Sequence, residues 1–575
     1  NANLKKLNFV KDNISKFEGD INVDLSGNTI DNLVGDVFVK HATYHNTKAT
    51  YSIDEFYINS AFDQNRVRTI TVNSGDIVDG VVVGKFYFNQ LQKLVTNSLG
   101  SLYENYKPIK VNKGQFLKFD FTIHNKIIEI FYPEVSIATN TVVKGTINSD
   151  NQEFKLNFNS PKITASDNTF DNIRVKVDNK NPLYNAFIEL DSINTKFYKV
   201  RDFSLINIKV KDTLIFRTEF KGGTKGQDYF NLNLYHTINK DNKNVVGFHK
   251  SEMKLKNYVW FLNEKESSDN QIVFDKSFKN FNFDNIVLTH QDQEITFMGD
   301  IKGNDYKDLK LSFKGVDLNK ITSSDPSFVV NGNLEAVINY KQDKLVYQPT
   351  ASIQIDNLNI NNTKLGYLEF DISGNENLKK FTVNSSLENE DTESFSANGS
   401  FEIVDKNTIL DLELKLDKLN LGILAPLGGD VISNIRGFAS GSASIAGNLK
   451  KPEINGRLYI DEAGLKIPYL NVDYSLDKRT VVDLTDSKFL FKKNVLTDTK
   501  FGTIGYLNGS VEHNNFSDWK LDLAINSKRL LVLDTKDSED AAYYGIAFID
   551  GVATIKGPTN SLFIKVDAKS EMGSS

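Results

Sequence analysis

The sequence predicts an all-β protein made of antiparallel strands, because of its hydrophobic pattern and its turn residues. Short runs that alternate apolar and polar residues recur along almost the whole chain, as in LELKL at 412–416 and LDLAI at 521–525. Such alternation places every second side chain on the same face of a strand. Between the runs lie residues typical of turns between antiparallel strands, such as the Asp and Asn residues at 240–244. We therefore expect a meander with one apolar face and one polar face.

Helical periodicity is rare in this chain. Apolar residues recur at helical spacing over residues 89–106, which predicts one amphipathic helix there. A second, shorter candidate covers residues 419–435 and is interrupted by Pro426. One or two short helices cannot cover a long sheet, so the apolar face needs another partner.

Composition excludes several classes of function. The chain has 68 Lys and Arg against 74 Asp and Glu, a net charge of −6, which gives no electrostatic attraction to nucleic acid. No apolar run approaches the ~18 residues that a membrane-spanning helix needs. The chain has no Cys, which excludes disulfides, thiolate metal sites and Cys nucleophiles and suits an oxidising compartment.

Catalytic and metal-binding patterns are missing from the sequence. The chain has seven His, and none of them falls in an HExxH frame or a comparable metal-binding spacing. No Gly-rich segment has the spacing of a nucleotide-binding loop. We therefore expect no enzyme activity, no catalytic residues, no metal and no cofactor.

Chain length predicts an extended sheet. At roughly 18 residues for a strand and its turn, the chain supplies about 30 strands, and at ~4.8 Å between strands the sheet would extend ~140 Å. Open sheets rarely exceed about ten strands without curling or splitting. The pattern alone therefore leaves two architectures open, a trough or a series of closed β-sandwiches.

Glycine-punctuated phrases repeat in the C-terminal part of the chain. GSASIAG at 441–447 is echoed by GVATIKG at 551–557. The run NIRGFASGSASIAGNLKKPEINGRLYIDEAGLKIP, within residues 412–476, resembles the signature of the TamB family and other AsmA-like proteins. Residues 498–573, with YYGIAFIDGVATIKGP, look like the continuation found in Bacteroidetes-type members of that family.

This resemblance implies a fold and a setting. Proteins of this bridge-like lipid-transfer superfamily form a long, curved, taco-like β-groove from a single antiparallel sheet. The resemblance further implies the periplasm of a Gram-negative bacterium, an N-terminal anchor in the inner membrane and an outer-membrane barrel partner of the Omp85 class, similar to TamA. Neither the anchor nor the segment that meets the barrel is recognisable here, so we expect a fragment that lacks both ends.

The same resemblance implies a division of the chain into groove units. We expect β-groove repeat units at residues 1–88, 107–308 and 309–411. The amphipathic helix at 89–106 separates the first two, and residues 412–575 form the region with the TamB signature.

A trough of this length needs an occupant. A lining ~140 Å long and ~15 Å wide would expose about 2,000 Å² of apolar surface, against the ~300–600 Å² patch of a typical monomer. At ~25 cal/mol per Å², leaving it in water would forgo on the order of 50 kcal/mol. Phospholipid acyl chains would fill it, and we expect a conduit that moves phospholipid between inner and outer membrane. The predicted lining consists of Phe230, Leu232, Leu234, Leu309, Leu311, Phe313, Ile353, Ile355, Leu412, Leu414, Leu416, Leu458, Ile460, Leu521, Leu523, Ile525, Leu562, Ile564 and Val566.

Two other functions fit the same pattern. The edges of a long antiparallel sheet can template an incoming strand, so the protein could be a scaffold or chaperone for the assembly and secretion of outer-membrane β-barrel proteins. A secreted adhesin built from tandem β-sandwiches is the third reading. The choice between them depends on whether the apolar side chains border an open groove or meet in a sealed interior.

Overall fold

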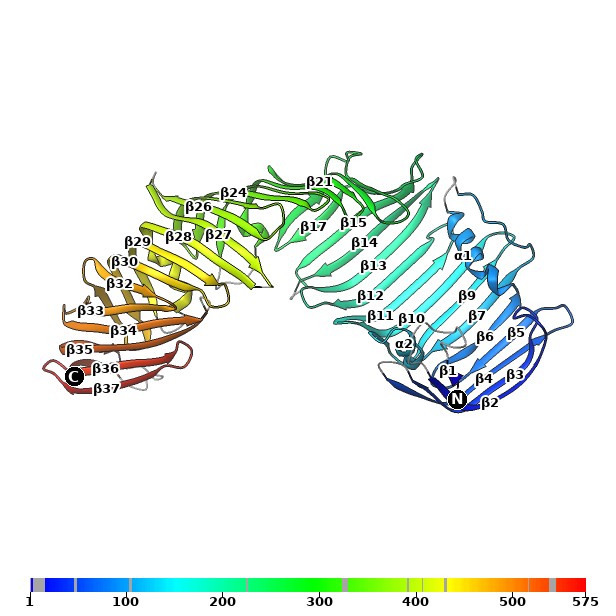
Figure 1. The fold of residues 1–575 in the computed structure, drawn as a ribbon, viewed down its shortest axis with the longest axis horizontal. Coiled ribbons are helices and arrows are strands. Elements are labelled where there is room, and N and C mark those ends of the chain that lie inside the picture. Colours follow the sequence, from blue (N-terminus) through cyan, green and yellow to red (C-terminus); the bar gives the residue numbers. More distant parts are fainter. Residues whose placement is uncertain are drawn as a thin grey trace. The chain divides into compact units, whose positions relative to one another are not determined.

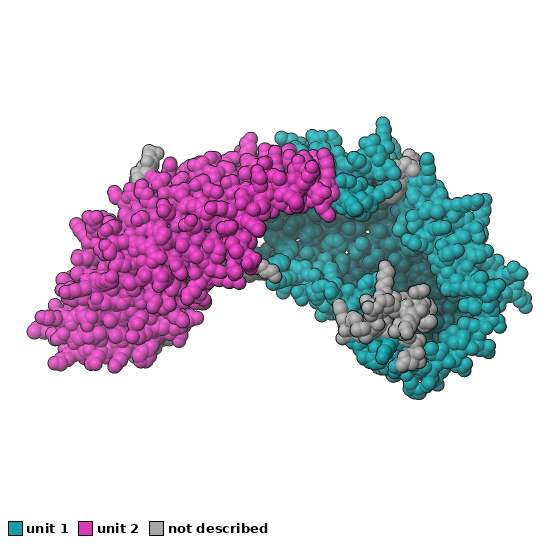
Figure 2. Space-filling model, viewed as in Figure 1, with its two compact units in different colours: residues 1–290 teal, residues 291–575 magenta. Residues whose placement is uncertain are grey.

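The computed structural model describes residues 2–3, 16–45, 49–102, 106–223, 226–322, 329–389, 392–405, 407–428, 432–514, 517–536 and 544–575. The chain divides into two compact units, unit 1 (Asn1–His290) and unit 2 (Gln291–Ser575), which Figure 2 colours separately. Both units consist almost wholly of β-strands, with a few short helices (Figure 1).

The strands of unit 1 pair antiparallel, mostly with their neighbours in the chain. They are β1 (Ala2–Asn3), β2 (Lys16–Ser26), β3 (Val34–His45), β4 (Thr50–Phe62), β5 (Arg68–Asn73), β6 (Val78–Lys85), β7 (Phe116–Ile123), β8 (Val135–Ile137), β9 (Thr141–Asn148), β10 (Glu153–Ala165), β11 (Asn168–Asp178), β12 (Ala186–Asn194), β13 (Lys199–Val210), β14 (Thr213–Gly222), β15 (Asp228–Ile238), β16 (Asn244–Phe248), β17 (Ser251–Leu255), β18 (Tyr258–Leu262), β19 (Gln271–Phe274) and β20 (Asn280–His290). Some positions are shared by two short strands, since β16 and β17 both pair with β15.

The strands of unit 2 follow the same meander. They are β21 (Gln293–Lys302), β22 (Tyr306–Asp317), β23 (Val330–Asp343), β24 (Val346–Ile360), β25 (Thr363–Gly374), β26 (Lys380–Asn389), β27 (Thr392–Val404), β28 (Asn407–Asn420), β29 (Ser433–Asn448), β30 (Glu453–Ile467), β31 (Val472–Leu476), β32 (Thr480–Thr485), β33 (Lys488–Asp498), β34 (Ile504–Asn514), β35 (Ser517–Thr535), β36 (Gly545–Pro558) and β37 (Phe563–Ser570). Here β31 and β32 share one position, because both pair with β30 and with β33.

Short helices lie in the connections between strands. Unit 1 contains η1 (Phe88–Gln90), α1 (Leu91–Gly100) and α2 (Asn125–Phe131), and unit 2 contains α3 (Leu318–Ile321), η2 (Leu421–Gly428) and η3 (Pro468–Leu470). The helix expected at residues 89–106 is represented by η1 and α1, and residues 103–105 lie outside the described part. The candidate at 419–435 forms only the 3-10 turn η2. Residues 429–431, within that candidate, lie outside the described part.

The antiparallel all-β fold predicted from the sequence is confirmed. In each unit the sheet is a single-layered, curved meander, a β-groove with short helices in its connections (Figure 1). The compact units meet at His290, and the repeat-unit boundaries expected at 308 and 411 stay a prediction.

Bulges give the sheet of unit 2 its bend. The pairing register with the neighbouring strand changes by one residue within five strands that all run in the same direction: β22, β24, β28, β30 and β33. At each shift one residue has a left-handed backbone: Gly315, Asn357, Lys418, Glu462 and Lys493, with φ between 52° and 59°. A bulge adds one residue to one strand and bends that strand. Because five strands of the same direction carry such a bulge, one wall of the groove is bent repeatedly along the unit.

Candidate functional site

Cross-strand register places the apolar residues of unit 2 on one face. Residues directly opposite each other in an antiparallel pair share a face of the sheet. One row of such partners is Phe313, Ala336, Ile353, Phe370, Ser385, Ala397, Leu414, Ala443, Gly456, Leu484, Phe489, Val511 and Leu521. A second row, two residues away, is Leu334, Ile355, Leu368, Leu387, Phe395, Leu416, Gly441, Leu458, Val482, Phe491, Gly509, Leu523, Ile555 and Ile564. We call the face that carries these rows the apolar face.

Unit 1 has an apolar face of the same kind. Its central row is Val23, Val37, Ile58, Val72, Gly80, Phe121, Val143, Phe158, Val175, Ile188, Leu205, Thr218 and Leu232. The row crosses the sheet from β2 to β15 with a single polar member, Thr218. The space-filling view shows that the surface of this unit is hollowed (Figure 2).

The opposite face is polar. The row that begins one residue from Leu311 reads Lys310, Asn339, Thr350, Ser373, Thr382, Ser400 and Asp411. The side chains of Lys310, Thr350 and Asp411 are exposed. The two faces therefore differ in polarity residue by residue, as the alternation in the sequence predicts.

The structure places the residues of the predicted lining on the apolar face. In β28, Leu412, Leu414 and Leu416 are half-buried, while Glu413 and Lys415 between them are exposed. The last strand is different, because Ile564 and Val566 of β37 are 53% and 54% exposed. Leu562 precedes β37 and is half-buried.

Partial burial separates this arrangement from a β-sandwich. Two packed sheets bury the inner residues of both, as in any protein core. In β24 and β28 the apolar side chains are mostly half-buried, so no second sheet covers them. The apolar side chains along these strands border a groove, and the tandem-sandwich reading is wrong for this stretch.

The groove is closed locally in unit 2. Val472, Leu496, Leu530 and Phe548 are buried in one cluster on strands β31, β33, β35 and β36. The hydroxyl of Tyr474 donates to the carbonyl oxygen of Leu531 at 2.7 Å, and burial raises the pKa of this tyrosine. The apolar face is therefore filled by protein side chains at this point.

Aromatic side chains line the apolar face near the end of unit 1. The rings of Phe220 and Phe230 stack with centroids 4.5 Å apart, and Phe230 lies opposite Met253. Met253 lies opposite Trp260, whose side chain is 0% exposed. Of the predicted lining, Phe230 thus belongs to a packed aromatic group, whereas Leu232 continues the central row.

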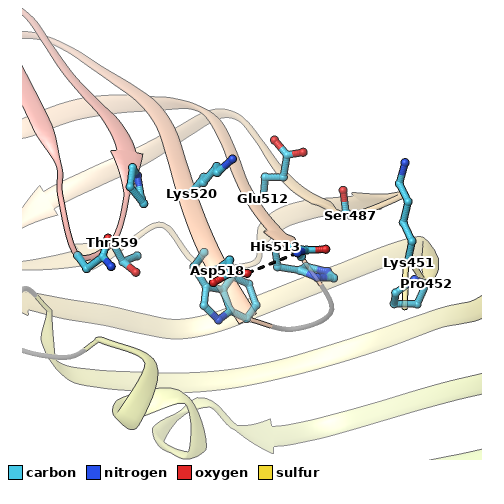
Figure 3. Close-up of a pocket in the computed structure, with 12 residues that line it drawn as sticks. Lys451, Pro452, Ser487, Glu512, His513, Asp518, Lys520 and Thr559 are labelled. Carbon is cyan, nitrogen blue, oxygen red and sulfur yellow. Dashed lines mark hydrogen bonds between the residues drawn. The ribbon is translucent and has the colours of Figure 1, made fainter. Parts of the chain in front are cut away.

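A pocket of about 750 Å³ lies where the apolar face of unit 2 meets the turns (Figure 3). It is lined by Lys451, Pro452, Ser487, Glu512, His513, Asn514, Asp518, Trp519, Lys520, Pro558, Thr559 and Asn560. Rings pack together here, with the centroids of His513 and Trp519 5.2 Å apart and those of Phe489 and Trp519 6.0 Å apart. Burial favours the neutral ring of His513 and lowers its pKa, and the nearby charge of Glu512 acts in the opposite direction. The pocket therefore joins an aromatic wall to a charged rim.

Several of these features were missed from sequence. The strand FLKFDFTI at 116–123 alternates as clearly as the predicted runs and carries Phe121, a member of the central row of unit 1. The alternation of apolar and polar residues in this strand was the sequence signal that would have predicted Phe121 on the apolar face. The pocket of Figure 3 had no such signal, because it joins turns that are far apart in the chain.

Two family models match this chain. Residues 248–460 match the model described as TamB, N-terminal domain, and residues 493–575 match the TamB C-terminal domain. Together the matches span just over half of the chain. The chain belongs to the TamB family. No curated protein and no solved structure matches it significantly.

Membership of the TamB family defines the general role. TamB proteins are periplasm-spanning, non-enzymatic proteins of outer-membrane assembly or lipid transport, and they associate with outer-membrane assembly partners. None of the helices that the structure describes is long and apolar enough to cross a membrane. In both units the apolar face is the surface to which a lipid or another apolar partner of such a protein could bind.

Proposed function

We infer that the apolar face holds the acyl chains of phospholipids and that the protein conducts phospholipid across the periplasm between inner and outer membrane. The observation that carries this proposal is the continuous register of partners, apolar apart from one Thr in unit 1 and one Ser in unit 2, from Val23 to Leu232 and from Phe313 to Leu521. Half-buried apolar side chains in such numbers are costly in water, at ~25 cal/mol per Å². Acyl chains that cover these side chains would exclude water from them and remove that cost.

The polarity of the groove also suits movement. Acyl chains make only dispersion and hydrophobic contacts with Leu, Ile, Val and Phe, which have no direction. A head group stays in water at the open side of the groove. A chain can therefore shift from one strand to the next without breaking a specific hydrogen bond.

Paired photo-crosslinking tests this proposal. A photoreactive residue at Leu311, Leu414 or Leu523 points to the apolar face, and the same residue at the neighbours Lys310, Glu413 or Asp522 points to the exposed polar face. We expect crosslinks to co-purified phospholipid, detected by mass spectrometry, from the first set and not from the second. Equal labelling of both sets would reject the groove as the lipid site.

The membrane partners belong to the same proposal. We propose that an Omp85-class barrel, similar to TamA, receives the lipid at the outer membrane, and that a segment outside this chain reaches the inner membrane. The TamB family supports this through its association with outer-membrane assembly partners. Co-purification of such a barrel with the full-length protein tests it, and its failure after mild crosslinking in intact cells contradicts it.

A scaffold for β-barrel assembly is the competing function. It predicts that photoreactive residues capture client protein at the ends of the sheet, where an edge strand offers unpaired backbone groups. Crosslinks to client protein from the last strand, β37, with no lipid captured at Leu414, would favour the scaffold over the conduit.

A further inference from the structure

Two helices lie against opposite halves of one strand of unit 1. The connection that contains α1 enters β7 at Phe116, and the connection that contains α2 leaves β7 after Ile123. Successive connections of a meander lie at opposite ends of the strands, so the two helices stand on opposite rims of the groove (Figure 1). Leu117 and Phe119 of β7 pack in the cluster of Leu94 from α1, and Phe121 and Ile123 line a cavity with α2.

The helix α1 is held by buried polar contacts. The side chain of Asn97, which is buried, donates to the carbonyl oxygen of Ile109 at 2.7 Å and accepts from its N–H at 2.8 Å. Asn179, in the turn after β11, donates to the carbonyl oxygen of Ser98 at 2.7 Å. Breaking such bonds without water is costly. The helix α1 is therefore a fixed part of the wall.

The helix α2 is held differently. Its polar contacts with the rim are half-buried: Lys126 forms an ion pair with Asp76, and the ring of His124 lies 2.8 Å from Asp79. At its other end Phe131 and Tyr132 are 69% and 66% exposed. No residue of α2 is buried, whereas Leu94 and Asn97 of α1 are. The cover formed by α2 is therefore easier to displace than that formed by α1.

A cavity of about 430 Å³ lies beneath α2. Val78, Phe121, Ile123 and Val143 line it from the sheet, and Ile128 and Phe131 line it from the helix. Phe121 and Val143 are partners in the central row of unit 1, so the cavity is continuous with the apolar face. Its volume lies within the ~300–1,000 Å³ of typical ligand sites.

We propose that this cavity is a discrete binding site for one lipid acyl chain, and that α2 must move for lipid to pass β7. The proposal rests on the proposed function and adds a defined position in the groove at which a lipid is held. The lining carries no charged side chain, so a charged or strongly polar ligand would lose its hydration there without compensation. A hydrocarbon chain has no such hydration to lose. Because the cavity is continuous with the central row, the chain can enter and leave along the apolar face.

A reversible lock on α2 tests this site. In a chain without native Cys, Lys126→Cys with Asp76→Cys can be joined by a short, reducible, thiol-specific crosslinker. We expect transfer of fluorescent phospholipid between vesicles of phosphatidylethanolamine and phosphatidylglycerol to fall about tenfold on linking, as for a blocked lid, and to recover on reduction. The unlinked double variant is the reference, so folding of the variant is controlled.

The matched control lies on the other face of the same strands. Lys144 of β9 and Asp120 of β7 form an ion pair at 2.9 Å on the polar face, and the pair Lys144→Cys with Asp120→Cys is linked in the same way. We expect this link to leave transfer unchanged. Equal transfer by the linked α2 variant and the linked control overturns the proposal.

Photo-crosslinking separates this proposal from the function on which it rests. A photoreactive residue at Val143 should capture phospholipid, and one at Lys144 should not. Lipid captured at Leu232 and Leu414 but absent at Val143 overturns the α2 site and leaves the conduit standing. Lipid absent at all three positions overturns both.

Discussion

Individual residues at the groove rims hold turns against the sheet. Arg68, on the apolar face of β5, is only 5% exposed. Its guanidinium donates to the hydroxyl of Ser60 at 2.9 Å and to the carbonyl oxygens of Ile30 and Leu33, both at 2.8 Å. Burial lowers its pKa, opposed by Asp31, yet an Arg stays protonated at any physiological pH. One buried cation thus fixes the turn between β2 and β3 onto a strand two positions away.

Removing this cation should destabilise unit 1. Arg68→Ala removes the guanidinium donor from the carbonyl oxygen of Ile30 and leaves that of Leu33 with the hydroxyl of Ser60 alone, at a cost of about 1–3 kcal/mol. In a Trp519→Phe background Trp260 is the sole tryptophan, so urea unfolding followed by its fluorescence reports on unit 1. Arg174→Ala, which removes an exposed ion pair with Glu189, is the control and should cost about 0.5 kcal/mol at most. Equal effects of the two substitutions would contradict the role of Arg68.

Protonation of His513 should weaken unit 2 in mild acid. Burial lowers the pKa of His513, which Glu512 opposes, so the unfolded chain binds a proton at higher pH than the folded one. The stabilisation from its neutral ring is then complete above about pH 6.5 and is lost as pH falls toward the lowered pKa. Unfolding of a Trp260→Phe variant, followed through Trp519, measures this loss.

His513→Phe is the matched variant for this pH dependence. It keeps a ring against Trp519 and Phe489 but cannot be protonated. Below pH 6.5 the protein with His513 should lose stability and the Phe variant should not lose this contribution. The stability of the Phe variant relative to that of the His513 protein should therefore rise. A constant difference between pH 7.5 and pH 5 would show that His513 is not the group involved.

At the scale of elements, bulged strands set the bend of the groove. The bulge in β28 lies between Leu416 and Leu419, and Lys418 has a left-handed backbone with φ of 55°. Its N–H donates to the hydroxyl of Ser440 at 2.9 Å. These five bulges occupy strands of one direction and bend the same wall, and Asn434 in β29 and Asp518 in β35 mark two further left-handed bulges of unit 2.

The backbone at Lys418 predicts opposite effects for two substitutions. Lys418→Gly should stabilise unit 2 by about 0.5–1 kcal/mol, since glycine adopts this conformation without the strain of a side chain. Lys418→Val should destabilise it by about 1–2 kcal/mol, because a β-branched residue fits this region worst. Denaturant midpoints followed through Trp519 check both. A Val variant as stable as the Gly variant would show that the bulge relaxes.

At the scale of the molecule, alternation made the sheet and its apolar face predictable. Leu412, Leu414 and Leu416 lie on one face because a strand has period two, and no long-range contact is needed to know it. Left-handed residues such as Lys418 and Glu462 gave no warning, since Lys and Glu carry no turn signal. The seven residues of α2 are too few for helical periodicity. The cluster around Tyr474 depends on register between distant strands, which sequence alone does not specify.

These gaps changed the expected site in one respect. A uniform trough was the natural prediction from alternating runs, and the structure instead interrupts the apolar face at β7 and near Tyr474. Both interruptions come from connections and strand breaks, the parts least constrained by local pattern. The residues of the apolar face were thus predictable in kind, whereas the connections and strand breaks that interrupt this face were not.

The proposed conduit would make the two apolar faces act in series, and this predicts how two blocking substitutions combine. Leu232→Arg in unit 1 and Leu414→Arg in unit 2 each put a cation on the apolar face. Either one alone should reduce phospholipid transfer about tenfold or more, because a charge in a hydrocarbon path costs several kcal/mol. The double variant should transfer little less than the slower single variant. Independent binding sites would instead lose activity in separate, additive portions.

The neighbours on the polar face provide the controls for this series test. One control is Asn231→Arg, at a position opposite Glu219 and Glu252 of the adjoining strands. The other is Glu413→Arg, at a position opposite Asn398 and Ser444. Neither puts a charge on the apolar face, so transfer should stay near that of the unmodified protein. Bound lipid, counted by mass spectrometry, should persist in each single variant, since the unblocked unit still holds chains. Loss of all lipid from one substitution would mean that the two apolar faces do not bind lipid separately, and the series arrangement would have to be abandoned.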